Sequence, residues 1–258
     1  MNKPTLAFFG ATGGCTLACL APALQAGYNC VCSRGLNPSS LPNLHIIQGS
    51  TTDLSAIAAT LYPADLPPVS MILSGVGGVP DFSNPLSPKF NGKTICQETV
   101  RNIFTVLRER TLPETPRELK PLLVVISTTG LTKDRDIPLA MVPLYKWGLK
   151  VPHADKKVME RIIFEEGAKP EHERVISEYT VIRPSLLNDG ASQREKVRVL
   201  KGHGEGQNTA VGTACSFVGY TICRGDVGGF MFELVKAIDG GERSEGREYF
   251  GSVVSISH

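Results

Sequence analysis

A glycine-rich loop near the start of the chain constrains the fold more than any other feature. Residues 6–16 have the sequence LAFFGATGGCT, in which a short apolar run passes into a glycine-rich turn and a helical pattern follows at once. Glycine at position 10 permits a tight turn, and glycine at 13 lets backbone N–H groups approach an anion. The positive end of the helix dipole favours the same anion. This arrangement is typical of an α/β sheet that binds a dinucleotide diphosphate.

The loop departs from the usual pattern at its last glycine. Thr16 replaces the glycine at which helix and strand pack closely, and Gly14 stands nearby instead. The hydroxyl of Thr16 could also donate to a phosphate. The alternative for the whole loop is a sharp turn in a sheet that binds nothing. If the loop binds the cofactor, the contacting residues are expected to be Gly10, Thr12, Gly13, Gly14, Cys15 and Thr16.

Apolar runs that alternate with helical patterns predict a parallel sheet covered on both faces. Strands are expected over residues 6–9, 28–32, 45–48, 69–74, 121–127 and 179–182. Helices are expected over residues 16–26, about 95–107, about 153–166 and from an N-cap at Asp226 onward. The prediction is one doubly wound α/β Rossmann domain, residues 1–258. Two irregular stretches, 75–93 and 186–216, follow strands and should wall the ligand crevice.

The composition excludes several classes of partner. The net charge is +2 and no dense run of Lys and Arg occurs, so nucleic acid is not an expected partner. No apolar run approaches the ~20 residues that cross a bilayer, and the first five residues are not a signal segment. Neither a membrane partner nor export is therefore expected, and the expected location is cytoplasmic. Seven cysteines lack a repeated ligand spacing, which predicts packing roles in a reducing compartment and no metal site.

The end of the second predicted strand favours NADP over NAD. The acidic residue that would bind the ribose 2′-hydroxyl of NAD is absent there, and Ser33 and Arg34 stand in its place. An Arg guanidinium suits the 2′-phosphate of NADP because it donates paired, charge-assisted hydrogen bonds. The alternative for Arg34 is a solvated surface charge. The expected cofactor is NADP(H).

Further cofactor contacts are expected where three other strands end. Asp53 could meet the adenine amine, or it could simply cap the next helix. Ser74 and Gly75 end the fourth strand, where a missing side chain lets the backbone run close to the ribose and nicotinamide. Pro184 ends the sixth strand beside the expected nicotinamide, whereas Arg183 is predicted to be a structural ion-pair partner.

Five short segments spread along the chain form a set. They are GATGGCT at 10–16, SRG at 33–35, GSTTDL at 49–54, ISTTG at 126–130 and YTVIRPSLL at 179–187. The set resembles the atypical short-chain dehydrogenase/reductases, the NmrA-like NAD(P)H-binding group. The segment GYTICRGDVG at 219–228 is similar to the averufin-oxidase-like reductases of fungal aromatic polyketide pathways. The resemblance implies a Rossmann sheet with a small C-terminal substrate-facing part, mainly 186–258.

The same resemblance implies a catalytic Tyr-x-x-x-Lys pair, which this chain lacks in its usual form. Glu160 follows Lys156 at the spacing that follows the family lysine, so Lys156 is the predicted lysine. Four residues before it, Pro152 replaces the tyrosine. His153, whose ordinary pKa is close to neutral, is the first substitute proton donor, and Tyr145 is the second.

Structural explanations compete with each of these catalytic roles. Lys156 and Lys157 could be exposed charges on an amphipathic helix. His153 could cap that helix, and Tyr145 beside Trp147 could belong to the core.

Hydroxyl groups at the end of the fifth predicted strand are further candidates. One of Ser127, Thr128 and Thr129 could orient a substrate oxygen, or all could satisfy backbone groups. The expected function is NADPH-dependent redox chemistry on a small carbonyl, quinone or polycyclic aromatic compound. Two alternatives stay open: an NADP-binding sensor without turnover, and an isomerase, dehydratase or cyclase that retains the nucleotide. The oligomeric state is not predicted.

Overall fold

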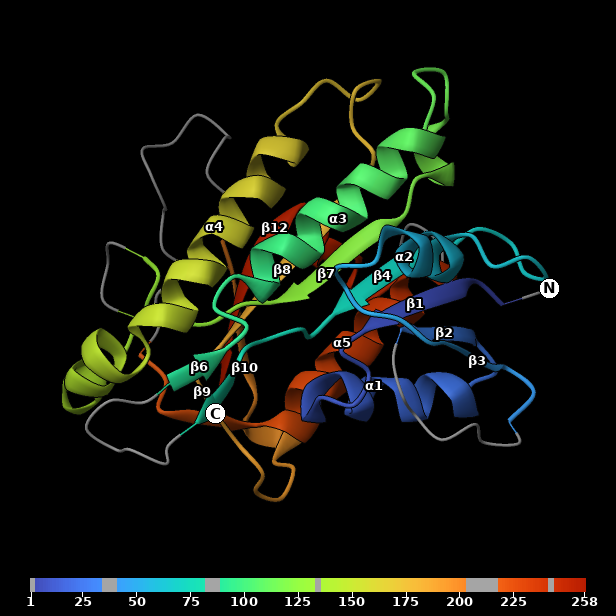
Figure 1. The fold of residues 1–258 in the computed structure, drawn as a ribbon. Helices are drawn as coiled ribbons and strands as arrows, with labels where there is room; N and C mark the ends of the chain where they lie inside the picture. Colours follow the sequence, from blue (N-terminus) through green and yellow to red (C-terminus); the bar gives the residue numbers. More distant parts are fainter. Residues whose placement is uncertain (1–2, 34–40, 82–88, 133–135, 203–217, 241–243) are drawn as a thin grey trace.

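An eight-stranded sheet forms the centre of the protein (Figure 1). The computed structural model describes residues 3–33, 41–81, 89–132, 136–202, 218–240 and 244–258. The strands of this sheet are β1 (Thr5–Phe9), β2 (Asn29–Ser33), β3 (Leu44–Ile47), β4 (Met71–Ser74), β7 (Leu122–Ile126), β8 (Tyr179–Pro184), β10 (Arg198–Gly202) and β12 (Ser252–Ser257). Their order is β10-β12-β8-β7-β4-β1-β2-β3, and every pair is parallel except β10 with β12.

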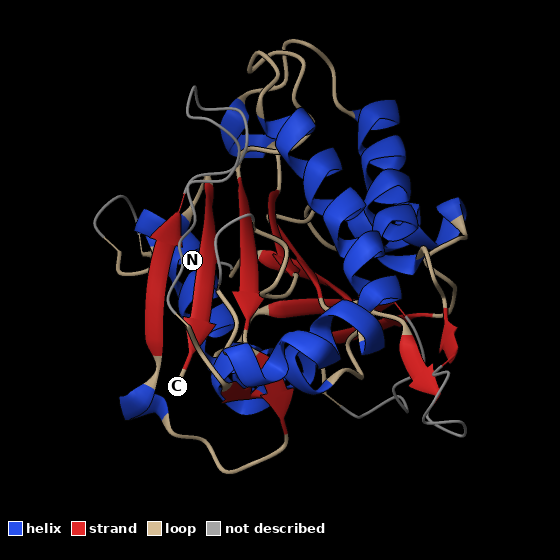
Figure 2. Cartoon of the chain, turned by 90° about the vertical axis from the view of Figure 1, so that its left-hand side faces the viewer, coloured by secondary structure: helices blue, strands red, loops and turns tan. Residues whose placement is uncertain are grey.

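Helices cover both faces of this sheet and create two cores (Figures 1 and 2). The helices are α1 (Gly14–Gln25), α2 (Leu54–Leu61), α3 (Ile95–Arg110), α4 (Lys150–Gly167) and α5 (Arg224–Asp239). Side chains of a strand alternate between faces, so β1 sends Leu6 and Phe8 into the core of α1 and α5. It sends Ala7 and Phe9 into the core of α2, α3 and α4. The predicted doubly wound α/β fold is confirmed.

The backbones of α1 and α5 approach each other closely. A Cβ atom added at Gly228 of α5 would lie 2.4 Å from Cβ of Ala18 and 2.5 Å from the carbonyl oxygen of Cys15. No residue larger than glycine fits at that position without a shift of one helix. The two helices are therefore packed as a pair, with their amino ends close to the same edge of the sheet.

One small sheet and a strand of a second lie in the stretches that were expected to be irregular. Strand β5 (Val79–Asp81) pairs antiparallel with β6 (Lys89–Asn91), and β9 (Leu186–Asn188) pairs parallel with β11 (Thr221–Cys223). The expectation of no regular structure over 75–93 and 186–216 was therefore wrong. Strands of three residues are too short to show a hydrophobic period in sequence. Strand β10 also falls in the second stretch, at the edge of the main sheet.

The strand order reverses direction between β1 and β4, which are neighbours in the sheet. In a doubly wound sheet the loops that leave such a pair diverge and open a crevice beyond the carboxyl ends of the strands. Here the loop after Phe9 and the loop after Ser74 flank that crevice. The candidate site is therefore located by topology.

The described ranges contain neither a membrane-spanning helix nor a metal-binding group of side chains. Within them, no helix has the length and apolar character to cross a membrane. No group of three or more His, Cys, Asp or Glu side chains in the same ranges is arranged to hold a metal ion. Six cysteines lie in the described ranges, and all six are buried free thiols.

Candidate functional site

A groove of about 590 Å³ opens at the carboxyl ends of β1 and β4. Its lining comes from loops that follow four strands of the sheet: residues 10–13, Ser33, residues 49–51 and residues 75–77, together with Ile95. The hydroxyl of Ser33 is buried and has no hydrogen-bond partner among the described residues. A buried polar group without a partner is costly, so it indicates a ligand that supplies one.

The amino end of α1 faces this groove without a cap. Gly10 has φ of +74°, and a Cβ there would lie 3.0 Å from the backbone nitrogen of Val76, so glycine is required. The N–H of Gly13 donates to the carbonyl oxygen of Gly10 at 2.8 Å and closes the turn. Gly13 is the N-cap residue, no side chain caps the helix, and its first turn carries no acidic residue. The positive end of the helix dipole is thus available to an anion.

The hydroxyl of Thr16 binds the loop backbone and is not available to a phosphate. Its side chain is fully buried, and its hydroxyl donates to the carbonyl oxygens of Gly10 at 2.5 Å and Gly13 at 3.0 Å. The suggestion that this hydroxyl binds a phosphate is therefore wrong, because the loop backbone already uses it. A Cβ at Gly75 would lie 2.7 Å from Cγ2 of Thr16, so Gly75 provides the space that the missing third glycine would have left.

A helix-capping residue follows the groove-lining residues 49–51. The carboxylate of Asp53 accepts hydrogen bonds from the N–H groups of Ser55 at 2.9 Å and Ala56 at 3.2 Å. Hydrogen bonds from Ser55 and Ala56 hold the pKa of Asp53 below its usual value. Of the two roles considered for Asp53, the helix cap is the one observed. Arg34 lies outside the described residues.

At the middle of the site the strand ends are tied to each other by backbone hydrogen bonds. The N–H of Gly75 donates to the carbonyl oxygen of Phe9 at 3.0 Å. This hydrogen bond holds the chain that leaves β4 against the end of β1. The carbonyl of Pro184, a buried residue, accepts from the N–H of Thr129 at 3.1 Å. Ser74 is buried at the end of β4.

Lys156 projects from α4 to the end of β7. Its ammonium group donates to the carbonyl oxygen of Ile126 at 2.7 Å, so it is not a purely solvated charge, whereas Lys157 is exposed. Glu160 does not pair with Lys156. It binds Arg183 through two hydrogen bonds of 2.9 and 2.5 Å, which confirms the ion pair predicted for Arg183.

Tyr145 and His153 pack against each other beside the end of β7. Their ring centroids are 5.3 Å apart at an interplanar angle of 64°. The hydroxyl groups of Tyr145 and Thr129 are 3.3 Å apart, and either can donate to the other. Gly130 has φ of +83°, and a Cβ there would lie 2.7 Å from the Tyr145 ring and 3.1 Å from the His153 ring. The glycine therefore makes room for both rings.

The expected proton donor must be corrected. Burial lowers the pKa of His153 to about 4, and the charge of Lys156 acts in the same direction. The imidazole is therefore neutral at pH 7, and the pKa close to neutral that recommended His153 does not apply. Burial raises the pKa of Tyr145, so its phenol keeps its proton. At neutral pH the phenol of Tyr145 therefore carries its proton, while the imidazole of His153 is uncharged.

Two more buried polar atoms without partners lie at this end of the site. They are Oγ of Ser127 and Nε2 of His153. Ser127 directly follows β7, and Thr128 beside it is partly exposed. Together with Ser33 in the groove, these atoms indicate hydrogen-bonding capacity that the described chain leaves unused.

Two buried carboxylates without a sequence signature hold the segments next to Lys156 and Tyr145 in place. Asp155 accepts from the N–H groups of Cys96 at 2.9 Å and Gln97 at 3.0 Å, so a residue of α4 caps α3. Asp136 accepts from the N–H of Gly130 at 2.9 and 3.0 Å. The Asp155 contact has no local sequence signal, because its partners are almost sixty residues away.

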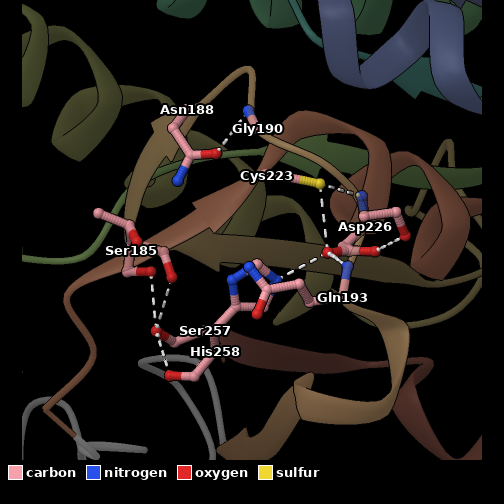
Figure 3. A network of polar contacts seen from close by, with 10 residues as sticks. Ser185, Asn188, Gly190, Gln193, Cys223, Asp226, Ser257 and His258 are labelled. Carbon is pink, nitrogen blue, oxygen red and sulfur yellow. Dashed lines mark hydrogen bonds and ion pairs between the residues drawn. The ribbon is translucent and has the colours of Figure 1, made fainter.

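Asp226 is a buried centre of hydrogen bonds and not the N-cap that was predicted (Figure 3). Helix α5 begins at Arg224, and Cys223 is its N-cap, with a sulfur that accepts from the N–H of Asp226. The Asp226 carboxylate accepts from the N–H of Gln193 at 2.9 Å and contacts Nε2 of His258 at 2.7 Å. Ser192 also donates to it.

Comparison with known proteins finds similar sequences. No family model matches the chain. It is 44% identical to the reductase pytE of Aspergillus terreus, over 100% of this chain and 99% of that protein. It is 35% identical to the oxidase pynE of Aspergillus niger, over 93% of this chain and 96% of that protein.

Solved structures of low sequence identity share the fold. A wide-type short-chain dehydrogenase/reductase of Veillonella parvula in complex with NADP aligns with a TM-score of 0.65 and 12% identity, over 99% of this chain and 94% of that chain. ChuY, described as an anaerobillin reductase of Escherichia coli O157:H7, aligns with a TM-score of 0.61 and 17% identity, over 98% and 96%.

Proposed function

Because the chain belongs to the atypical short-chain dehydrogenase/reductases, as a relative of the Aspergillus reductase and oxidase, we propose that it is an NADP-dependent oxidoreductase. Its substrate is a small carbonyl, quinone or polycyclic aromatic compound. The reaction belongs to fungal secondary metabolism and takes place in the cytoplasm. One observation carries the proposal: the groove that joins the uncapped amino end of α1 to the buried, unpartnered hydroxyl of Ser33.

The residues of the groove fit a dinucleotide. Gly10, Thr12, Gly13, Gly14 and Cys15 surround the diphosphate, with N–H groups of the first helical turn as donors. Thr16 supports the loop from below. Ser33 takes the adenosine ribose, while Ser74, Gly75 and Pro184 flank the rest of the cofactor. Asp53 acts indirectly, since it fixes the start of α2 beside the groove.

The preference for NADP is assigned to Arg34. No carboxylate is present at the end of β2, where NAD-binding proteins of this topology bind the ribose 2′-hydroxyl. An arginine side chain there supplies the charge that a 2′-phosphate needs. Arg34→Gln is therefore expected to weaken NADP⁺ binding by about tenfold to a hundredfold and to leave NAD⁺ binding unchanged.

Tyr145 is assigned the role of proton donor. When bound, NADPH supplies a hydride to an electrophilic carbon, and the attached oxygen then requires a proton. The buried phenol of Tyr145 is protonated and is connected to Thr129. His153 contributes a neutral ring that orients Tyr145, and its unpartnered Nε2 is available to a substrate hydroxyl.

Lys156 and Ser127 complete the proposed site. The ammonium group of Lys156 fixes the end of β7 through Ile126 and places a positive charge near Tyr145 and the substrate oxygen. The free hydroxyl of Ser127 donates to the substrate or to the nicotinamide, and Thr128 beside it is a second candidate. We assign the substrate-facing wall mainly to residues 186–258, within one domain of residues 1–258.

Calorimetry and a turnover assay test the proposal together. NADP⁺, NADPH, NAD⁺ and NADH are titrated into the protein, and loss of NADPH absorbance is followed with menadione and with a flavin as acceptors. Binding of NADPH with oxidation by a quinone is the expected result. Binding without turnover for any acceptor favours the nucleotide sensor, and a product of unchanged mass favours the non-redox enzyme. Absence of heat with all four nucleotides rejects the proposal.

A further inference from the structure

Arg224, the first residue of α5, lies across the amino end of α1. A Cβ atom added at Gly14 would lie 2.5 Å from Cδ of Arg224 and 3.3 Å from its Cβ. The aliphatic part of the arginine therefore occupies the space that a side chain at position 14 would need. This close contact brings a guanidinium group from the C-terminal part of the chain to the first turn of α1.

Two cations flank that turn. Burial raises the pKa of the Cys15 thiol to about 11, and the nearby charges of Arg224 and Lys156 both oppose this effect. Arg224 comes from the face of the sheet covered by α1 and α5, and Lys156 comes from α4 on the other face. The N–H groups of α1 and the cationic side chains of Arg224 and Lys156 therefore make the potential at this helix end positive.

The partner of Arg224 in the described structure is an exposed carboxylate. Nη1 of Arg224 lies 2.7 Å from Oδ1 of Asp189, and the Asp189 side chain is 84% exposed. Such a surface pair is weak because water screens it and both side chains must be ordered. A phosphate group accepts paired hydrogen bonds from a guanidinium and holds it more strongly.

The backbone around Arg224 is held in place independently of that pair. Asp226, two residues later, binds Gln193 and His258 in the buried network of Figure 3. Gly228, one turn later, contacts Ala18 and Cys15 of α1. The position of Arg224 is therefore set by folding, while its exposed partner can be exchanged.

We infer that Arg224 binds the diphosphate of the dinucleotide, and that Asp189 is the carboxylate that it releases when the dinucleotide binds. The inference rests on the proposed function, and the unpartnered Ser33 hydroxyl in the adjoining groove is an independent sign of a ligand. Arg34 and Arg224 then have separate tasks. The first recognises the 2′-phosphate, and the second recognises the diphosphate that NADP and NAD share.

Calorimetric titration of NADP⁺ and NAD⁺ into two variants tests this assignment. Arg224→Gln removes the guanidinium and is expected to raise both dissociation constants by about tenfold to a hundredfold, with their ratio unchanged. Asp189→Asn removes the competing carboxylate and is expected to lower both constants by about two- to fivefold. The opposite signs matter, because general damage to the fold would weaken binding in both variants.

A matched control is a second ion pair that involves the same helix. Arg194 packs on Gly229 of α5 and pairs with Glu233 at 3.3 Å, so Arg194→Gln and Glu233→Gln alter a similar ion pair at another position. Both controls are expected to bind NADP⁺ and NAD⁺ like the wild type. Thermal unfolding without ligand shows whether each variant is folded, and if Arg224→Gln is not, Asp189→Asn decides alone.

Three results would overturn the inference while the proposed function stands. They are normal binding by folded Arg224→Gln, a loss confined to NADP⁺, and weaker or unchanged binding by Asp189→Asn. If the wild type binds neither nucleotide, the proposed function itself has failed.

Discussion

We propose that Tyr145 supplies the proton that the missing family tyrosine would have supplied. The family tyrosine position is Pro152, one residue before His153 in α4. Tyr145 instead enters the site from a short turn before α4 and meets Thr129 at the end of β7. Its phenol is buried, and burial favours the protonated form of the group.

Replacement of Tyr145 by Phe keeps the ring packing and removes the proton donor. General acid catalysis contributes about a hundredfold to ten-thousandfold, so kcat with a quinone is expected to fall by at least about a hundredfold. The dissociation constant of NADPH, measured by calorimetry, should not change. Thr129→Val, which removes only the partner hydroxyl, should have the smaller effect. Wild-type turnover in Tyr145→Phe would exclude this residue as the donor.

His153 is expected to make the protein less stable in mild acid. Its pKa is about 4 in the folded protein and about 6.5 in an unfolded chain, so the unfolded state binds the extra proton first as the pH falls. Its contribution to the free energy of unfolding is complete above about pH 6.5 and is lost progressively towards pH 4. The loss is on the order of 2–3 kcal/mol.

The measurement compares urea unfolding of the wild type and His153→Phe between pH 4 and 7. Phenylalanine keeps the ring contact with Tyr145 but cannot bind a proton, so the variant should lose less stability in acid. Identical pH dependence in the two proteins would show that His153 does not titrate in this range.

At the scale of elements, the carboxylate of Asp155 joins α3 to α4. It caps the amino end of α3 from a neighbouring helix, and the next residue, Lys156, reaches the end of β7. The cap therefore contributes to the position of Lys156 as well as to stability.

Asp155→Ala leaves two backbone N–H groups of α3 without a partner in a buried place. The free energy of unfolding is expected to fall by about 2–3 kcal/mol, measured by urea denaturation. Glu98→Gln is the control, since this exposed residue lies in the first turn of the same helix and should change stability by less than about 0.5 kcal/mol. Equal effects of the two changes would mean that the Asp155 contact is not a working cap.

The sequence predicts elements well where burial is complete on both faces. Strands β1, β4 and β7 are buried at every position, and their uninterrupted apolar runs identify them. Strand β12 is equally buried but was not predicted, because the serines at 252, 255 and 257 interrupt its apolar run. One of these hydroxyls, that of Ser257, is satisfied by Ser185 of another segment, which no local pattern reveals.

The site, too, could be predicted from sequence only where its contacts are local. The loop from Gly10 to Thr16 is local in sequence, so its turn and its helix start could be predicted from spacing alone. The pairing of Tyr145 with Thr129 and the contact of Arg224 with Gly14 depend on how distant elements pack. The pKa of His153 likewise depends on burial, which residue type does not reveal.

At the scale of the whole molecule, the proposed cofactor contacts loops that follow strands in the middle of the sheet. A ligand held there binds the folded chain and not the unfolded one, so it must raise global stability. With NADPH at about a hundred times its dissociation constant, the free energy of unfolding is expected to rise by about 2.7 kcal/mol. Urea unfolding followed by circular dichroism measures this. An unchanged midpoint at that concentration would contradict binding at the groove.

The close backbone contact at Gly228 has a consequence for how a ligand is received. Because α1 and α5 cannot slide past each other without a clash at Gly228, we expect the turn at the amino end of α1 to keep its shape when a nucleotide binds. Nucleotide binding should then require little further ordering of the protein, so it should cost little conformational entropy. Amide hydrogens in the middle of both helices should exchange slowly with deuterium in the free protein, and nucleotide should slow them only through the gain in global stability.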